Sequence, residues 1–269
     1  EVASGKLRLV RPVPVPVLTR AQRRNSSIGA NVHLHAKWDA LAKMGIHWAR
    51  DYASGWLAKS ENLPFGDKSV PHINFKEMYD YADEQGVTVL PCIQQGFRTP
   101  DLKYFISDTD KIAAGYERLS KAFPEIEFWE LDNEIDLQHH GNPLEFEKFF
   151  ESYVACIQAA NDGLTRAGHG AKVVLNGDAG INYERTQRLL GLVGDDFAVS
   201  NFHFYTGTIP PEISRTDFNT NAENLLGASG FLDRMRAFSK LAHDNGKQAW
   251  LTEIDWDETN GPTVGERLQ

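Results

Sequence analysis

The sequence has few cysteines, no long apolar run and no glycine-rich phosphate motif. Cys92 and Cys156 are too few to predict a disulfide framework, and each lies in an apolar run that favours a buried free thiol. No segment offers the length of apolar sequence that a membrane-spanning helix needs. The motifs GxGxxG and GxxxxGKS/T are both missing, which argues against a dinucleotide or nucleotide phosphate site.

Basic residues are fewer than acidic ones: the chain has 28 Lys and Arg and 37 Asp and Glu, which gives a net charge of −9. This balance provides no electrostatic footprint for nucleic acid or for an anionic membrane, so we expect neither as a partner. The chain of 269 residues is long enough for one barrel domain. Neither the oligomeric state nor the compartment follows from the sequence, although a secreted or periplasmic location is slightly favoured.

The first 27 residues differ in composition from the rest. Pro12, Pro14 and Pro16 alternate with valines, which suits an extended segment and excludes a central strand. A polar stretch then runs to residue 27. We interpret residues 1–27 as an N-terminal lead-in or the tail of an upstream domain, and residues 28–269 as a single catalytic domain.

From residue 28 onward, short apolar segments typical of strands alternate with segments of helical periodicity. The predicted strands cover residues 28–35, 46–52, 87–93, 126–131, 172–176, 198–205 and 248–254. The predicted helices cover residues 38–44, 75–85, 109–123, 143–167, 184–190 and 231–245. Strands that are apolar on both faces and separated by helices indicate a parallel sheet covered by helices.

Two architectures fit this pattern, the open doubly wound sheet and the closed barrel. An open sheet of this kind usually has a glycine-rich phosphate loop, whereas here polar and aromatic residues end nearly every strand, as at the rim of a barrel. We therefore predict an α/β fold, a (β/α)8 TIM-type barrel with seven readable strands. An eighth strand and helix are expected to belong to the full protein and to be absent from this sequence, or else Leu7–Val10 of the lead-in fills the gap.

Two carboxylates stand at the ends of predicted strands four and seven. Glu134 follows Phe-Trp-Glu-Leu-Asp-Asn, and Glu253 closes Trp-Leu-Thr-Glu. In a closed barrel these two strands face each other across the mouth, so the two side chains can flank one bond. Glycoside cleavage needs such a pair, one carboxyl to protonate the leaving oxygen and the other to attack or to activate water.

The arrangement resembles clan A of the glycoside hydrolases, the four/seven superfamily of retaining barrels. Asn133-Glu134 matches the acid/base motif of that clan, and Glu253 matches its nucleophile. Arg50 resembles the arginine that commonly ends strand two. His203 and Tyr205 resemble the pair on strand six, whose tyrosine binds the nucleophile. Within the clan, the xylosidase/iduronidase family thirty-nine and related endoglycosidases look nearest.

The resemblance implies a retaining O-glycosidase that acts on an oligosaccharide or polysaccharide through a covalent glycosyl-enzyme, with no cofactor. Arg50 is expected to keep Glu253 ionised, because a nearby cation favours the charged carboxylate. Asn133 is expected to donate to a sugar hydroxyl. The alternatives are a transglycosylase on the same barrel and a non-catalytic carbohydrate-binding barrel. A serine or cysteine hydrolase is disfavoured, since no GxSxG motif is present.

Further residues are weaker candidates for contacts with the sugar. His35 and Trp256 are included in the predicted substrate site. Four other residues follow or end predicted strands, namely Trp56, Gln94, Gln95 and Asn176. Packing or structural hydrogen bonds would explain them as well as sugar contacts would. Asp136, His139 and His140 could suggest a metal, but no metal-ligand motif accompanies them, so no metal is predicted. The segments 54–72 and 206–228 are expected to wall the cleft.

Overall fold

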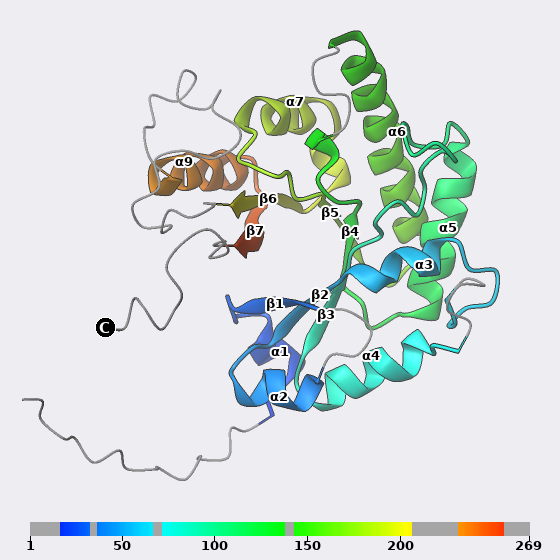
Figure 1. Ribbon diagram of the computed structural model, residues 1–269, viewed down its shortest axis with the longest axis vertical. Coiled ribbons are helices and arrows are strands. Elements are labelled where there is room, and N and C mark those ends of the chain that lie inside the picture. The colour runs from blue at the N-terminus through cyan, green and yellow to red at the C-terminus, as the bar shows by residue number, and fades with distance from the viewer. Residues whose placement is uncertain (1–16, 33–36, 67–71, 138–142, 206–230, 256–269) are drawn as a thin grey trace, which may run out of the picture.

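The computed structural model describes residues 17–32, 37–66, 72–137, 143–205 and 231–255 (Figure 1). Within these ranges seven strands alternate with helices, and each lies where the sequence predicts one. They are β1 (Gly29–Val32), β2 (Trp48–Asp51), β3 (Thr88–Pro91), β4 (Phe128–Leu131), β5 (Lys172–Leu175), β6 (Val199–Tyr205) and β7 (Gln248–Asp255). The predicted ranges contain the observed strands, except that β7 runs one residue further.

The helices between the strands also follow the predicted order. They are α1 (Arg20–Arg23), α2 (Trp38–Lys43), α3 (Gly55–Ala58), α4 (Phe75–Glu84), α5 (Thr109–Ala122), α6 (Pro143–Ala167), α7 (Tyr183–Val193) and α9 (Phe231–Asp244). Three 3-10 turns accompany them, η1 (Tyr52–Ser54), η2 (Ile135–Leu137) and η3 (Gly194–Asp196). The short helices α1 and α3 were not predicted, because four residues are too few to show helical periodicity.

Local capping explains where the longer helices begin and end. The Asn74 side chain accepts hydrogen bonds from two backbone amides at the start of α4, and Asp108 caps α5 in the same way. After α6, Gly168 adopts φ +78°, a conformation that glycine enters without steric cost and that ends the helix. Helix α1 owes its place to a capping box between Thr19 and Gln22.

The strands are parallel and lie in sequence order. Strands β1, β2 and β3 form one ladder, and β4, β5, β6 and β7 form a second. A parallel bridge between Cys92 and Glu130 joins the two ladders, so the order runs from β1 to β7 without interruption. The fold is thus of the (β/α)8 TIM-barrel type, with seven strands among the described residues, as predicted. Leu7–Val10, the proposed substitute for an eighth strand, lies outside those residues.

The seam between β7 and β1 is open over the described part of the chain, where no ladder joins the two strands. A cavity of about 850 Å³ lies there, lined by residues of both strands. Trp48, Phe128 and Trp250 also line it. Trp250 packs edge to face on each of the other two rings, which are tilted against each other, with ring centroids 5.1–6.2 Å apart.

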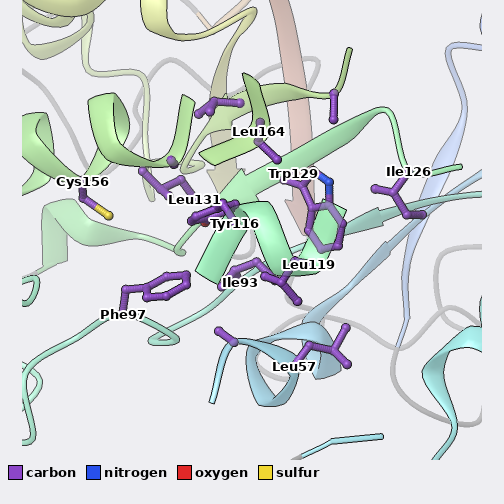
Figure 2. Close-up of a cluster of buried hydrophobic side chains, with 14 of the residues drawn as sticks. Leu57, Ile93, Phe97, Tyr116, Leu119, Ile126, Trp129, Leu131, Cys156 and Leu164 are labelled. Atoms are coloured by element: carbon purple, nitrogen blue, oxygen red, sulfur yellow. The ribbon is translucent and has the colours of Figure 1, made fainter. Parts of the chain in front are cut away.

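The main hydrophobic core lies between the sheet and the helices outside it. Trp129 and Leu131 of β4 pack there with Tyr116 and Leu119 of α5 and with Leu164 of α6 (Figure 2). Because successive strand residues point to opposite faces, the alternate residue Glu130 points into the barrel. The outward face of β4 therefore stabilises the fold, and its inward face can carry chemistry.

Within the described residues, no helix combines the length and the apolar character required to cross a bilayer.

Candidate active site

The two predicted catalytic glutamates meet at the C-terminal ends of the strands. Glu134 follows β4, and Glu253 lies on β7. An oxygen of each carboxylate and a ring nitrogen of His203 all lie within 4.8 Å of one another. The side chains of Glu134 and Glu253 are 19% and 13% exposed, so both remain reachable from solvent. The barrel therefore brings together residues that lie far apart in the sequence.

The turn after β4 holds Glu134 in an unusual backbone conformation. Asp132 and Glu134 have φ values of +71° and +45°, in the left-handed region that non-glycine residues seldom adopt. Arg98 binds the Asp132 carboxylate at 2.5 Å, and the Glu134 amide donates to the Gly177 carbonyl at 2.9 Å. These contacts hold a sharp turn at the rim, and the Glu134 carboxyl lies against the His203 ring, 2.9 Å from Nδ1.

Arg50 connects the nucleophile candidate with the interior of the barrel. One guanidinium nitrogen, Nη1, donates to Glu253 Oε1 at 2.6 Å, and Nη2 donates to Asn133 Oδ1 at 2.7 Å. On its other edge the guanidinium binds both oxygens of Glu130, including an Nη2–Oε1 contact of 2.9 Å. The guanidinium also stacks over the Tyr52 ring at 4.5 Å. The rigid fork of arginine suits this simultaneous binding of several oxygens.

Both Arg50 and Glu130 are buried, with side chains 4% and 0% exposed. Burial by itself lowers the pKa of Arg50, but the attraction of Glu130 and Glu253 outweighs it and raises that pKa above its usual value. Burial also raises the pKa of the neighbouring Cys92 thiol well above its usual range. The site thus contains a permanent cation beside a neutral thiol.

A β-bulge shapes the part of the site contributed by β6 and β7. The pairing changes from Phe202 opposite Leu251 to His203 opposite Glu253, which leaves Thr252 as the extra residue on β7. The Thr252 hydroxyl lies 3.1 Å from His203 Nε2 and donates to Asn201 Oδ1 at 2.8 Å. Trp250 packs inside the barrel with Trp48 and Phe128, so alternation along β7 also points Thr252 inward. The bulge then places the next residue, Glu253, on the same inner face, opposite His203.

His203 is completely buried and contacts both catalytic candidates. Its Nδ1 lies 2.9 Å from Glu134 Oε1, and its Nε2 lies 3.7 Å from Glu253 Oε1. Burial lowers the pKa of His203, the hydrogen bond with Glu134 opposes this effect, and the Arg50 cation adds to it. The net direction is downward, so the ring is neutral at neutral pH.

Gly177, which follows β5, fits against the face of His203. A Cβ at this position would lie only 2.0 Å from His203 Nε2. The backbone of Gly177 also accepts from the Glu134 amide and donates to Glu130 Oε1 at 3.3 Å. The absence of a side chain here is what allows His203 to lie between the two glutamates.

If Glu134 and Glu253 act on a glycoside, as the sequence predicts, Gly177→Ala should lower kcat by about 100-fold, because a displaced His203 would misplace Glu134. Steady-state kinetics on an aryl glycoside would measure this. Gly191→Ala is the matched control, since nothing lies within 4 Å of a Cβ at that helical position. It should leave kcat unchanged and raise stability by about 0.5–1 kcal/mol. Equal kinetics for the two variants would refute a tight fit of His203 against Gly177.

The structure brings together five of the eight predicted site residues, namely Arg50, Asn133, Glu134, His203 and Glu253. Tyr205 ends β6, but its side chain is not among the described ones, so its predicted contact with the nucleophile remains a prediction. His35 and Trp256 lie outside the described residues. The segment 206–228, predicted to line the cleft, also lies outside the described residues. In the other predicted cleft segment, 54–72, the residues after Ser54 form helix α3.

Several of the weaker candidates have structural roles. Trp56 packs against the main core, and Asn176 is buried with its amide bound to Asp178. Asp136 accepts a hydrogen bond from the Ala179 amide at 3.0 Å, which explains its place after β4 without a metal. His139 and His140 are outside the described residues. The side chains of Trp56, Asn176 and Asp136 therefore all lie outside the contact network around Glu134 and Glu253.

Glu134, His203 and Glu253 are the one group among the described residues with the composition and spacing to be considered for a metal. The Arg50 cation already binds Glu253 at 2.6 Å, and its repulsion would oppose a second cation beside it. A neutral imidazole has one ring lone pair, and the hydrogen bonds of His203 already engage both ring nitrogens. We retain the prediction of a metal-free site on this physical ground.

The sequence reasoning missed Glu130, Asn201 and Thr252. The signal for Glu130 was available, because a carboxylate in the middle of the buried run Phe-Trp-Glu-Leu needs a buried partner. Asn201 shares the inward face of β6 with His203, at a spacing of two. Thr252 was missed because it directly precedes Glu253, and simple alternation puts adjacent strand residues on opposite faces, whereas the bulge brings both to the inner face.

Comparison with known proteins identifies the class of fold. No protein-family model matches the chain, and no curated protein sequence matches it either. Many solved structures do match, and they include TIM-barrel glycoside hydrolases. At 11–15% sequence identity these matches establish the fold alone.

Three of these structures illustrate the likeness. The endo-1,4-β-D-mannanase of Thermotoga petrophila has a TM-score of 0.55 at 14% identity, over 88% of this chain and 81% of that one. A trimodular endoglucanase of subfamily GH5-4 has a TM-score of 0.61 at 14% identity, over 93% of this chain but only 53% of that one. A broad-specificity GH5-4 endoglucanase from Clostridium acetobutylicum has a TM-score of 0.53 at 11% identity, over 90% of both chains.

Proposed function

We propose that the chain is a retaining O-glycoside hydrolase of clan A, with Glu134 as acid/base and Glu253 as nucleophile. The observation that carries this proposal is the approach of the two carboxylates to within 4.8 Å. Retaining enzymes hold their carboxyl groups about 5–5.5 Å apart, whereas inverting enzymes leave about 6.5–9.5 Å for a water molecule. The short separation favours direct attack by Glu253 on the sugar.

In the first step, the Glu253 carboxylate forms a bond to the anomeric carbon while the glycosidic bond breaks. The leaving oxygen takes the proton of Glu134, so the aglycone departs as a neutral alcohol. In the second step, Glu134 removes a proton from water, and the resulting hydroxide displaces Glu253 from the anomeric carbon. The configuration at that carbon is inverted twice and therefore retained.

The contacts of Arg50 support the division of roles. Its Nη1 donates to Glu253 Oε1, which favours the ionised form that a nucleophile needs. Its Nη2 binds Asn133 Oδ1 at 2.7 Å and thereby orients the Asn133 amide, whose nitrogen then serves as a donor for a sugar hydroxyl. The surroundings of Glu134 contain a neutral imidazole instead, which suits a carboxyl that begins the cycle protonated.

The structures named above favour polysaccharides of the mannan or glucan kind as first substrates to test, since they include an endo-mannanase and endoglucanases. They give no support to the expected kinship with family thirty-nine. A transglycosylase would share the covalent intermediate and differ in its acceptor. A silent carbohydrate-binding barrel would have no need for two carboxylates this close together, and it is the less favoured alternative.

The proposal predicts retention of the anomeric configuration. We expect hydrolysis of at least one member of a panel of aryl glycosides, mannans and glucans, with the retained anomer as the first product. Proton NMR at early times, before mutarotation, would identify that anomer. Inversion would contradict the covalent mechanism, and a complete lack of turnover across the panel would contradict the enzyme assignment. Products lengthened by an added sugar acceptor would favour the transglycosylase.

A further inference from the structure

A continuous series of hydrogen bonds runs from a buried carboxylate to the general acid. Glu130 Oε1 accepts from Asn201 Nδ2 at 2.8 Å, and Asn201 Oδ1 accepts from the Thr252 hydroxyl at 2.8 Å. Thr252 Oγ1 lies 3.1 Å from His203 Nε2, and His203 Nδ1 lies 2.9 Å from Glu134 Oε1. We call these five side chains the Glu130–Glu134 relay.

The direction of each hydrogen bond in the relay follows from Glu130, the residue at the buried end of the relay. Glu130 is bound on both oxygens by the Arg50 guanidinium, so as a carboxylate it can only accept. The Asn201 amide must therefore present its nitrogen to Glu130 and its oxygen to Thr252. The Thr252 hydroxyl gives its single proton to that oxygen, which leaves its lone pairs for the next contact.

The same reasoning fixes the tautomer of His203. Because Thr252 Oγ1 is an acceptor toward the ring, the ring proton belongs on Nε2. Glu253 Oε1, 3.7 Å from Nε2, is also an acceptor and favours the same position. A neutral imidazole protonated on Nε2 offers a lone pair at Nδ1. The group that faces this lone pair, Glu134 Oε1, must then be the donor.

We propose that the relay makes His203 Nδ1 an acceptor and so keeps the catalytic proton on Glu134 in the resting enzyme. This inference rests on the proposed function and deepens it, since it assigns Thr252, Asn201 and Glu130 as positioning residues for the acid. A protonated Glu134 is what the first chemical step requires. The relay leaves β4 at Glu130, passes through side chains of β6 and β7, and returns to Glu134 just after β4, so Glu130 acts without touching the substrate.

The charged groups around the imidazole agree with a neutral ring. Arg50 on β2 opposes protonation of His203, while Glu130, Glu134 and Glu253 favour it. Burial is the largest effect and lowers the pKa of His203. Asp178, whose carbonyl accepts from the His203 amide, has its carboxylate paired with Arg185. A neutral ring can be protonated on only one nitrogen, and the relay selects Nε2.

Nitrogen-15 NMR of histidine-labelled protein tests the tautomer directly, with the His203 signals assigned by their loss in His203→Gln. We expect protonation at Nε2 in the wild type and in Thr252→Ser, which keeps the hydroxyl. In Thr252→Val, which lacks it, the Nδ1-protonated tautomer should become populated. Wild-type protein with the proton on Nδ1, or with a doubly protonated ring at neutral pH, would overturn the proposal. This measurement does not depend on turnover.

Kinetics provide the second readout. With a poor leaving group, the alkaline limb of kcat/KM reports Glu134, and Thr252→Val should move it to lower pH by about one unit, the equivalent of one hydrogen bond. With dinitrophenolate, which needs no proton, the variant and the wild type should have the same alkaline profile. A uniform loss on both substrates, with no movement of the limb, would mean that Thr252 is only structural. An inactive wild type with Nε2 protonated would instead refute the proposed function alone.

Discussion

Glu253→Ala should be inactive on every glycoside, whatever its leaving group. Without this carboxylate no glycosyl-enzyme can form, so the loss should reach several orders of magnitude. The loss should be equally severe with dinitrophenyl and with unactivated substrates, because nucleophilic attack is required for both. Residual activity above about one per cent of the wild type, a barrier change under about 3 kcal/mol, would exclude Glu253 as the nucleophile.

Glu134→Ala is the matched comparison, because it removes the other carboxylate of the pair. Formation of the glycosyl-enzyme from a dinitrophenyl glycoside should survive, since that leaving group needs no proton. Hydrolysis of the intermediate should be slow because water has lost its base, so a burst of phenol is expected. Azide, which needs no base, should restore turnover and give a glycosyl azide of retained configuration. Equal losses on good and poor leaving groups, without azide rescue, would remove the acid/base assignment from Glu134.

Arg50→Met should have the largest effect on stability. The substitution leaves Glu130 fully buried without its cation, and breaking such a pair costs about 3–5 kcal/mol. Chemical denaturation monitored by fluorescence would measure this change. Turnover should be lost as well, because Glu253 and Asn133 both depend on the same guanidinium.

The double variant Arg50→Met/Glu130→Met separates these two effects. Replacing the whole buried pair with apolar side chains should recover much of the lost stability, because no unpaired charge remains. Activity should stay absent, since the support of the catalytic groups has gone. Arg236→Met, which breaks an exposed pair with Asp233, is the surface control and should leave both properties unchanged. If the double variant were no more stable than Arg50→Met, the buried charge would not explain the cost.

The positions of the strands and of the two glutamates could be predicted because they depend on local patterns. Apolar runs of strand length identified all seven strands, and barrel topology brings the ends of the fourth and seventh strands, with their carboxylates, to the same rim. The relay could not be predicted in the same way. It depends on a bulge in β7, which places the adjacent residues Thr252 and Glu253 on the same inner face, and on the absence of a side chain at Gly177. Both are properties of packing between strands that are distant in sequence.

Arg50 illustrates the intermediate case. Its contact with Glu253 was expected, but its ion pair with Glu130 was not, because the prediction considered the rim and not the interior. A buried arginine carries a charge that must be balanced inside the barrel, and the inward residue of β4 is positioned to do so. The balance of buried charge can thus identify residues that motif comparison leaves out.

The left-handed backbone of Glu134 has a consequence for how this position can change. An L-residue in this region costs about 1–2 kcal/mol, whereas glycine adopts it freely. Glycine would, however, leave the buried Nδ1 of His203 without the carboxyl that faces it, and such an unsatisfied group costs about 1–3 kcal/mol. The two costs are of similar size, so a screen for thermal stability alone would distinguish glutamate from glycine at position 134 only weakly. A directed-evolution library of this barrel therefore needs a screen for turnover to control this position.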